Sequence, residues 1–134
     1  MTRIWQRLYL GSFKDAEHLS TANPCGITTV LSLCEDVVRR ARNISYVHLP
    51  VADSRAITAL RLNEIIGAIA DSVRRGKLLV HCVAGSSRSP IMIAAWLDRC
   101  GYADIELALG EINEIRDIDP SPVLLKSVKE HLTK

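Results

Sequence analysis

The sequence predicts an α/β protein with three layers, in which a central, mostly parallel sheet of four to five strands is flanked by helices. Two patterns favour this class. Short, branched apolar segments alternate along the chain with longer segments whose apolar residues recur at helical spacing. The 134 residues contain no internal repeat, linker or low-complexity stretch, so we expect a single domain over residues 1–134.

The expected strands are short and rich in branched apolar residues. They cover residues 3–10, 28–33, 45–51 and 77–82. Leu78-Leu79-Val80 in the last of them has the continuous apolar character of a buried strand.

The expected helices lie between these strands and after them. They cover residues 12–22, 35–42, 58–75, 89–101, 103–116 and 121–132. In the third of these, Ile65, Ile69 and Val73 recur on one face, which indicates ordinary amphipathic packing. In the fourth, Pro90 is tolerated in the first turn and Gly101 ends the helix.

Residues 81–89 carry the strongest chemical signal. They read His81-Cys82-Val83-Ala84-Gly85-Ser86-Ser87-Arg88-Ser89, between a strand end and a helix start. Backbone N–H groups in such a loop have no helical partners, so with the helix dipole they form an anion site, here for a phosphate. Small side chains let the backbone wrap closely around the oxygens, and Gly85 can adopt a positive φ. Arg88 closes the site with a bidentate contact, and the same field favours a nucleophilic thiolate at Cys82.

A thiolate that attacks phosphorus needs a general acid to protonate the leaving oxygen. Asp53 is the candidate, because it follows the expected 45–51 strand and opens a polar loop. Loops at the carboxyl ends of strands are where α/β proteins build their sites. The residues alone also leave Asp36 and Asp71 open as acids.

From Leu8 to about Leu132 the chain resembles the small dual-specificity branch of the cysteine-dependent protein tyrosine phosphatases. The main match is His81-Cys82 followed by Ala84-Gly85 and Ser87-Arg88-Ser89. Three segments support it in the same order: Leu8-Tyr9-Leu10-Gly11-Ser12, Gly26-Ile27-Thr28, and His48-Leu49-Pro50-Val51 with Asp53. The resemblance implies a protein tyrosine phosphatase-like fold and hydrolysis of phosphotyrosine, phosphoserine and phosphothreonine through a phosphocysteine intermediate.

The resemblance also assigns roles to individual residues. It makes Cys82 the nucleophile, Arg88 the phosphate clamp and Asp53 the acid that later serves as base for water. The Ser89 hydroxyl would steady the leaving thiolate, and His81 would hold the loop. The backbone that binds phosphate would belong to Val83, Ala84, Gly85, Ser86 and Ser87. This chemistry needs no metal and no cofactor.

One segment departs from the family pattern. Where relatives commonly carry Pro-Asn, this chain has Asp119-Pro120-Ser121-Pro122, so we expect different support behind the loop. Arg55 and Arg116 are open to two interpretations. Each could meet a second substrate phosphate or form an ion pair with a neighbouring carboxylate.

Composition excludes several other classes of protein. A net charge of +2 and 4% aromatic residues argue against nucleic-acid binding, and Arg39-Arg40-Ala41-Arg42 is interpreted as a solvated helix face. There is no apolar run of membrane length, signal peptide or prenylation cysteine, so we expect no membrane attachment. The four cysteines lack metal-site spacing and suit a reducing compartment.

We therefore expect a monomer in the cytoplasm, or in the nucleus of a eukaryote, that acts on a phosphorylated protein. Three alternatives remain: a phosphate-binding module that has lost turnover, a sulfur-transfer enzyme, and a phosphatase of a non-protein phosphoester. Redox partnership of Cys82 with Cys34 or Cys100 is also left open.

Overall fold

The computed structural model describes residues 1–133, whose strands form one five-stranded sheet in the order β1-β2-β5-β3-β4. β1 pairs antiparallel with β2, and the other neighbours are parallel. The predicted mostly parallel sheet is therefore confirmed. The strands are β1 (Thr2–Trp5), β2 (Leu8–Gly11), β3 (Thr29–Ser32), β4 (Ser45–His48) and β5 (Leu78–His81).

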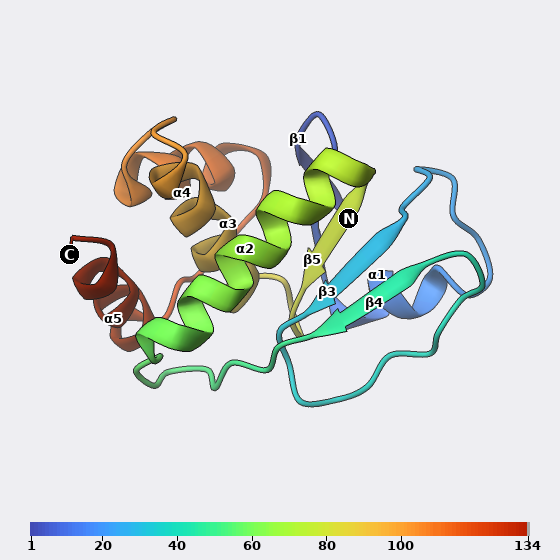
Figure 1. The fold of residues 1–134 in the computed structure, drawn as a ribbon, viewed down its shortest axis with the longest axis horizontal. Coiled ribbons are helices and arrows are strands. Elements are labelled where there is room, and N and C mark those ends of the chain that lie inside the picture. The colour runs from blue at the N-terminus through green and yellow to red at the C-terminus, as the bar shows by residue number, and fades with distance from the viewer. Residues whose placement is uncertain (134) are drawn as a thin grey trace.

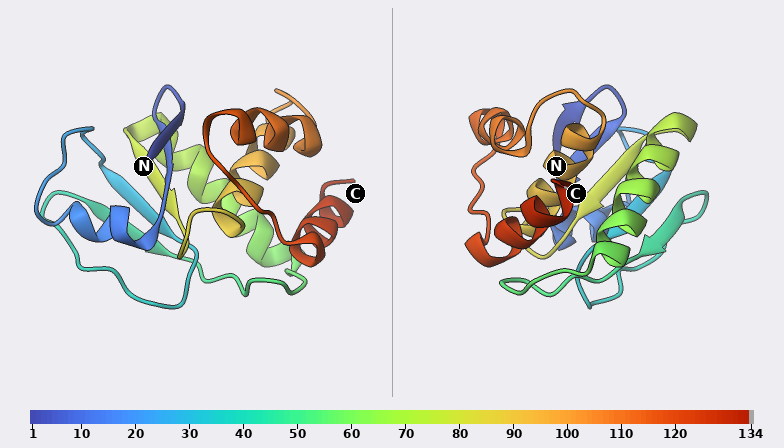
Figure 2. Two further views of the ribbon diagram at one scale, coloured as in Figure 1. Left: turned by 180° about the vertical axis from the view of Figure 1, so that it is seen from behind. Right: turned by 60° about the vertical axis from the view of Figure 1, so that its left-hand side comes forward.

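Helices cover both faces of the sheet, which confirms the three layers. Helix α2 crosses the near face in Figure 1, and α1 lies on the opposite face, as the view from behind in Figure 2 shows. Helices α3, α4 and α5 gather on the α2 side of the molecule. The helices are α1 (Phe13–His18), α2 (Ala59–Arg75), α3 (Arg88–Arg99), α4 (Ile105–Ile115) and α5 (Pro122–Leu132).

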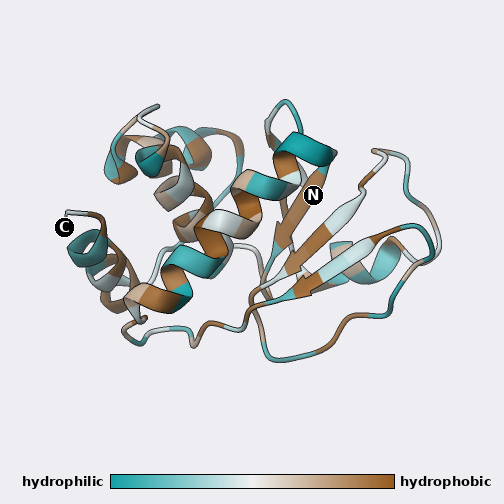
Figure 3. Ribbon diagram, viewed as in Figure 1, coloured by the Kyte–Doolittle hydropathy of each residue, from teal (hydrophilic) through white to brown (hydrophobic). Residues whose placement is uncertain are grey.

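The central strand β5 contributes to the core on both sides. Because side chains alternate along a strand, Leu78 and Val80 join the larger core with α2 and α3, whereas Leu79 joins the smaller core under α1. Figure 3 shows β5 as hydrophobic along its length and α2 as alternately hydrophilic and hydrophobic. Because β5 is the central strand, the loop that follows it lies at the middle of the end of the sheet where the parallel strands finish.

Four helices begin at the side-chain caps that short polar residues provide. Ser12, Thr58, Asp104 and Ser121 each accept a hydrogen bond from a backbone N–H of the first turn. The observed boundaries of α2 to α5 lie within two residues of those predicted. Helix α1 ends earlier than its predicted 12–22 range, in a turn where the hydroxyls of Ser20 and Thr21 donate to backbone carbonyls.

Two predicted elements are wrong. Residues 3–10 form two strands, because the chain turns at Gln6-Arg7 and β1 folds back on β2. Residues 35–42 form no helix. In this connection, side chains accept the backbone N–H groups in place of helical carbonyls: Glu17 takes that of Arg39, and the Tyr46 hydroxyl takes that of Ala41 at 2.7 Å. The arginines of 39–42 therefore lie on a loop.

Candidate active site

The loop from Cys82 to Ser87 joins β5 to α3 at the carboxyl ends of the parallel strands. Cys82 is 2% exposed, whereas Val83 and Ala84 lie at the surface. Gly85 has a φ of 73°, as the sequence predicts. A Cβ atom there would lie 2.6 Å from the Gly11 carbonyl oxygen, so both the backbone conformation and the space require glycine.

His81 anchors the start of the loop and is fully buried. Its Nδ1 lies 3.0 Å from the Cys82 carbonyl, which can only accept, so Nδ1 carries the proton. Its Nε2 lies 2.6 Å from the Ser32 hydroxyl on the neighbouring strand. Burial lowers the pKa of His81, so the imidazole is neutral and Nε2 accepts from Ser32. The residue thus ties the backbone of Cys82 to β3.

Arg88 is the first residue of α3 and is 8% exposed. Its Nη1 donates to the Val51 carbonyl at 3.0 Å and lies 3.8 Å from the Glu35 carboxylate. Within residues 1–133, its Nε and Nη2 make no hydrogen bond. The guanidinium is thus fixed through Nη1, and its Nε and Nη2 donors stay available for an anion. Glu35 is 71% exposed, so water screens its attraction for Arg88.

Asp53 is brought to the loop although it precedes Cys82 by 29 residues. Its Oδ1 accepts from the Ser87 hydroxyl at 3.2 Å, and its side chain is exposed. Asp71 forms ion pairs with Arg74 and Arg75. These residues lie near the end of α2, just before β5 begins, and so at the end of the strand opposite to the loop. Asp36 follows β3, but within residues 1–133 its carboxylate forms no hydrogen bond or ion pair with the loop. Asp53 is thus the one of the three acids that is hydrogen-bonded to the loop.

Ser89 lies in the first turn of α3 and is fully buried. Its hydroxyl is the only buried side-chain polar atom without a hydrogen-bond partner in the described residues. An unpaired buried hydroxyl is unusual, and this one lies in the first turn of the helix that follows the loop, where it has a donor available.

Two cysteines differ in their distance from Cys82. Ser32 pairs with His81 on the neighbouring strand and Leu33 N donates to the His81 carbonyl at 3.0 Å, so Cys34 and Cys82 both lie just beyond the carboxyl ends of neighbouring strands. Burial raises the pKa of the Cys34 thiol. Cys100 lies beyond the far end of α3, about 18 Å along the helix from the loop. Cys34 alone of the two therefore lies near the site.

Arg116 holds the loop from behind. Its guanidinium donates to the carbonyls of Gly85 at 3.0 Å and Ala84 at 3.3 Å, and to Thr2 Oγ1 at 3.0 Å. A weaker contact reaches the Leu10 carbonyl at 3.4 Å. Within residues 1–133 it makes no ion pair, so the predicted pairing of Arg116 with a neighbouring carboxylate is wrong, while contact with a second substrate phosphate stays a prediction. Arg55 is exposed and makes no hydrogen bond or ion pair in the same range.

The segment that departs from the family pattern also supports the loop. Asp119 N donates to the Ser86 carbonyl at 2.7 Å, and Ser121 N donates to the Ser87 hydroxyl at 2.9 Å. Ser87 therefore links three parts of the chain: the Asp53 loop, the start of α3 and the connection to α5. Sequence reasoning missed Ser32, Ser121 and the bracing contacts of Arg116, since no local pattern marks residues that act across such separations.

Comparison with known proteins matches this arrangement. Residues 8–134 fit the family model described as "Dual specificity phosphatase, catalytic domain". The chain belongs to this family.

Individual dual specificity phosphatases resemble it over most of its length. It is 33% identical over 99 residues to human dual specificity protein phosphatase 22, covering 72% of this chain and 54% of that protein. It is 31% identical over 118 residues to human dual specificity protein phosphatase 15, covering 84% and 40%. The crystal structure of human DUSP28 superposes with a TM-score of 0.86 at 22% identity, covering 99% and 96%. The chain spans about half the length of the curated relatives it matches.

Among residues 1–133, no three His, Cys, Asp or Glu side chains gather closely enough to hold a metal ion. No helix in the same range is long and apolar enough to cross a bilayer.

Proposed function

We propose that residues 1–134 form one catalytic domain that hydrolyses phosphotyrosine, phosphoserine and phosphothreonine in proteins through a phosphocysteine on Cys82. The observation that carries the proposal is the hydrogen bond between Ser87 and Asp53. It joins the candidate acid to the loop that begins with the candidate nucleophile. Family membership supports the same reaction.

The proposed reaction has two displacements. In the first, the Cys82 thiolate attacks phosphorus, the ester P–O bond breaks, and Asp53 gives its proton to the leaving oxygen. In the second, water attacks the phosphocysteine, Asp53 takes the water proton, and the S–P bond breaks to release phosphate and the thiolate. The loop N–H groups and Arg88 stabilise the charge on the transferring phosphoryl group in both steps.

Two further residues have supporting roles in this proposal. The unpaired hydroxyl of Ser89 is free to donate to the Cys82 thiolate when it leaves phosphorus. His81 fixes the backbone of Cys82 and remains neutral. Backbone N–H groups of residues 83–88 receive the phosphate oxygens.

The substrate class rests on the surface position of the loop. Val83 and Ala84 are exposed, so a phosphate at the end of a protein side chain can reach the loop without entering a deep cleft. Both aromatic and aliphatic phosphoesters then have access. We also propose that the domain acts as a monomer in the cytoplasm or nucleus, where a reducing environment keeps its four free cysteines as thiols.

Turnover of p-nitrophenyl phosphate with chelator present tests the reaction. Wild type is compared with Cys82→Ser, Arg88→Ala, Asp53→Asn and Ser89→Ala, and with Asp71→Asn as a matched acid outside the loop. We expect no turnover for Cys82→Ser, and losses of about 10²–10⁴-fold for Asp53→Asn. Asp71→Asn should retain wild-type rates, and acid quenching of wild type should trap phosphate on Cys82.

Hydrolysis of phosphopeptides then tests the proposed substrate class. Matched phosphotyrosyl, phosphoseryl and phosphothreonyl peptides should all be hydrolysed. Turnover of lipid or sugar phosphates without turnover of peptides would contradict the proposed substrates. Vanadate binding that depends on Arg88, without any turnover, would instead identify a binding module.

A further inference from the structure

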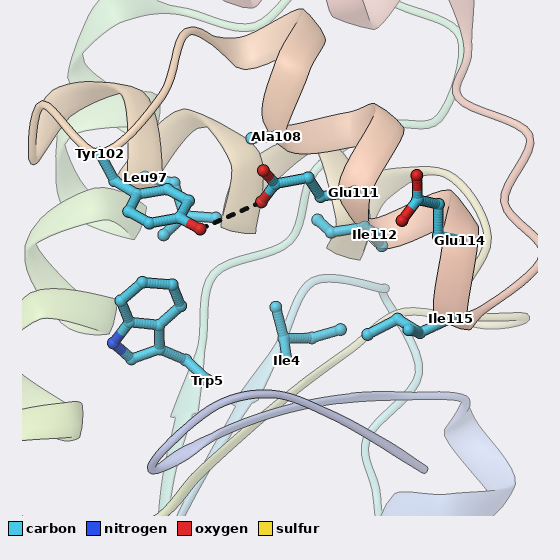
Figure 4. A pocket seen from close by; sticks show the side chains of 9 residues that line it. All are labelled: Ile4, Trp5, Leu97, Tyr102, Ala108, Glu111, Ile112, Glu114 and Ile115. Atoms are coloured by element: carbon cyan, nitrogen blue, oxygen red, sulfur yellow. Dashed lines mark hydrogen bonds between the residues drawn. The ribbon is translucent and has the colours of Figure 1, made fainter.

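A cavity of about 360 Å³ lies between the N-terminal hairpin and the helices α3 and α4 (Figure 4). None of its lining residues belongs to the loop of residues 82–89 or to the Asp53 loop. Its volume lies at the lower end of the range of ligand sites, about 300–1,000 Å³. The cavity is therefore separate from the proposed reaction.

Two aromatic rings form one end of the cavity. Trp5 and Tyr102 meet edge to face with ring centres 4.6 Å apart, and Figure 4 shows one ring above the other. Trp5 is 40% exposed and Tyr102 50% exposed. Ile4 and Ile112 provide apolar surface beside them. Exposed aromatic and aliphatic surface of this kind favours a ligand that has an apolar portion.

Two carboxylates of α4 line the same cavity. Glu111 accepts from the Tyr102 hydroxyl at 3.2 Å, and this carboxylate raises the pKa of Tyr102. Glu114 makes no hydrogen bond or ion pair within residues 1–133. No lysine or arginine lines the cavity. The nearby guanidinium of Arg116 is held by the loop carbonyls, and that of Arg99 donates to the Asn63 side chain.

Apolar and aromatic surface beside two carboxylates favours a ligand that has both an apolar portion and a positive charge. An apolar partner would cover the two carboxylates without neutralising their charge, which costs free energy. A cation pairs with both carboxylates and is attracted to the aromatic faces. Lysine and arginine side chains combine a cation with an apolar stem, so they suit both portions of the cavity.

We propose that this cavity is a docking site for a basic segment of a partner protein. The stem of an arginine or lysine lies along Ile4 and Ile112, and its cation reaches Glu111 and Glu114 beside the two rings. A segment fits better than a free small cation, because Ile115 at the rim is 56% exposed and offers surface for a flanking apolar residue. The proposal does not depend on the phosphatase activity.

Peptide titration followed by two-dimensional NMR tests the proposal. The probe is acetyl-Leu-Arg-Leu-amide, and acetyl-Leu-Gln-Leu-amide is the neutral match. The Trp5 indole N–H and the amides of α4 report on the cavity. Protein variants are Glu111→Gln with Glu114→Gln, which removes the charges and keeps the shape, and Glu130→Gln on α5 as a control. Backbone spectra of each variant verify folding.

We expect the arginine peptide to shift the Trp5 and α4 signals and to bind about tenfold more tightly than the neutral peptide. The double variant should lose about tenfold for the arginine peptide only, Glu130→Gln should bind like wild type, and added salt should weaken binding. Equal binding of the two peptides, or wild-type affinity in the double variant, would overturn the proposal. Shifts confined to other surfaces would do the same. Tetramethylammonium binding as tightly as the peptide would reassign the cavity to small organic cations.

Discussion

Replacing Arg116 by methionine is expected to slow phosphate-ester hydrolysis although Arg116 lies behind the loop. Methionine keeps an apolar stem of similar length and removes all four guanidinium contacts. Two of them end on loop carbonyls, those of Gly85 at 3.0 Å and Ala84 at 3.3 Å. The change therefore loosens the backbone that we propose binds phosphate, without touching a reacting atom.

The size of the effect follows from these two bonds. A hydrogen bond contributes about 0.5–1.5 kcal/mol net, and because Arg116 is half-buried we take the lower part of this range for each. A loss of about 1–2 kcal/mol lowers kcat/KM about five- to thirtyfold. Arg116→Lys, which restores one donor, should lie between the methionine variant and wild type.

Steady-state kinetics with p-nitrophenyl phosphate and calorimetric titration with vanadate measure the effect. Both kcat/KM and vanadate affinity should fall in Arg116→Met. Arg99→Met, which removes only a 3.3 Å contact to Asn63, should leave both unchanged. A folded Arg116→Met protein with kcat/KM within twofold of wild type would refute the bracing role. A loss seen only with doubly phosphorylated peptides would show that Arg116 binds a second phosphate.

Three further predictions concern stability and the loop. His81 is neutral in the fold because burial lowers its pKa, so the unfolded chain binds more protons. The free energy of unfolding should fall by up to about 1.4 kcal/mol per pH unit as the pH drops below about 6.5, and this dependence should shrink in His81→Asn urea titrations. Gly85→Ala should destabilise by at least about 1–2 kcal/mol in thermal melts and abolish turnover, since its φ is positive and its Cβ lacks space. Ser87→Ala should cost about 1–3 kcal/mol in urea unfolding and reduce kcat, because the Ser121 N–H and Asp53 lose their shared partner.

Matched controls separate these effects from general damage. His18→Gln removes a surface histidine and should leave the steep pH dependence in place. An unchanged slope in His81→Asn would contradict the assignment to His81. Gly67→Ala, in α2 with nothing within 4 Å of its Cβ, should stabilise by about 0.5–1 kcal/mol. A Gly85→Ala protein as stable and active as wild type would contradict the steric argument, and wild-type stability in Ser87→Ala would remove Ser87 as a link.

Elements with a strong local pattern could be predicted from the sequence. Helix α2 begins within one residue of its expected start, because its periodic apolar face is a local signal. The strand, small-residue loop and helix around Cys82 were predicted for the same reason. The prediction of a helix over residues 35–42 is wrong, because two of its backbone N–H groups donate to the side chains of Glu17 and Tyr46. Helical periodicity carries no information on partners from other segments.

For this protein, the sequence by itself determined the fold class and the family, and it supplied the residues for which we propose the chemistry of the loop, because each depends on residue types at short spacing. The residue types alone left three acids open and the family resemblance selected Asp53, but only the tertiary structure shows that Asp53 is hydrogen-bonded to the loop and what supports the loop. Parallel pairing of β5 with β3 and β2 brings together the loops that follow separate strands, so Asp53 reaches Ser87 across 34 residues. Packing of α4 then returns Arg116 to the loop from behind. Contacts between distant segments form only when the whole core packs, and no local sequence pattern encodes that packing.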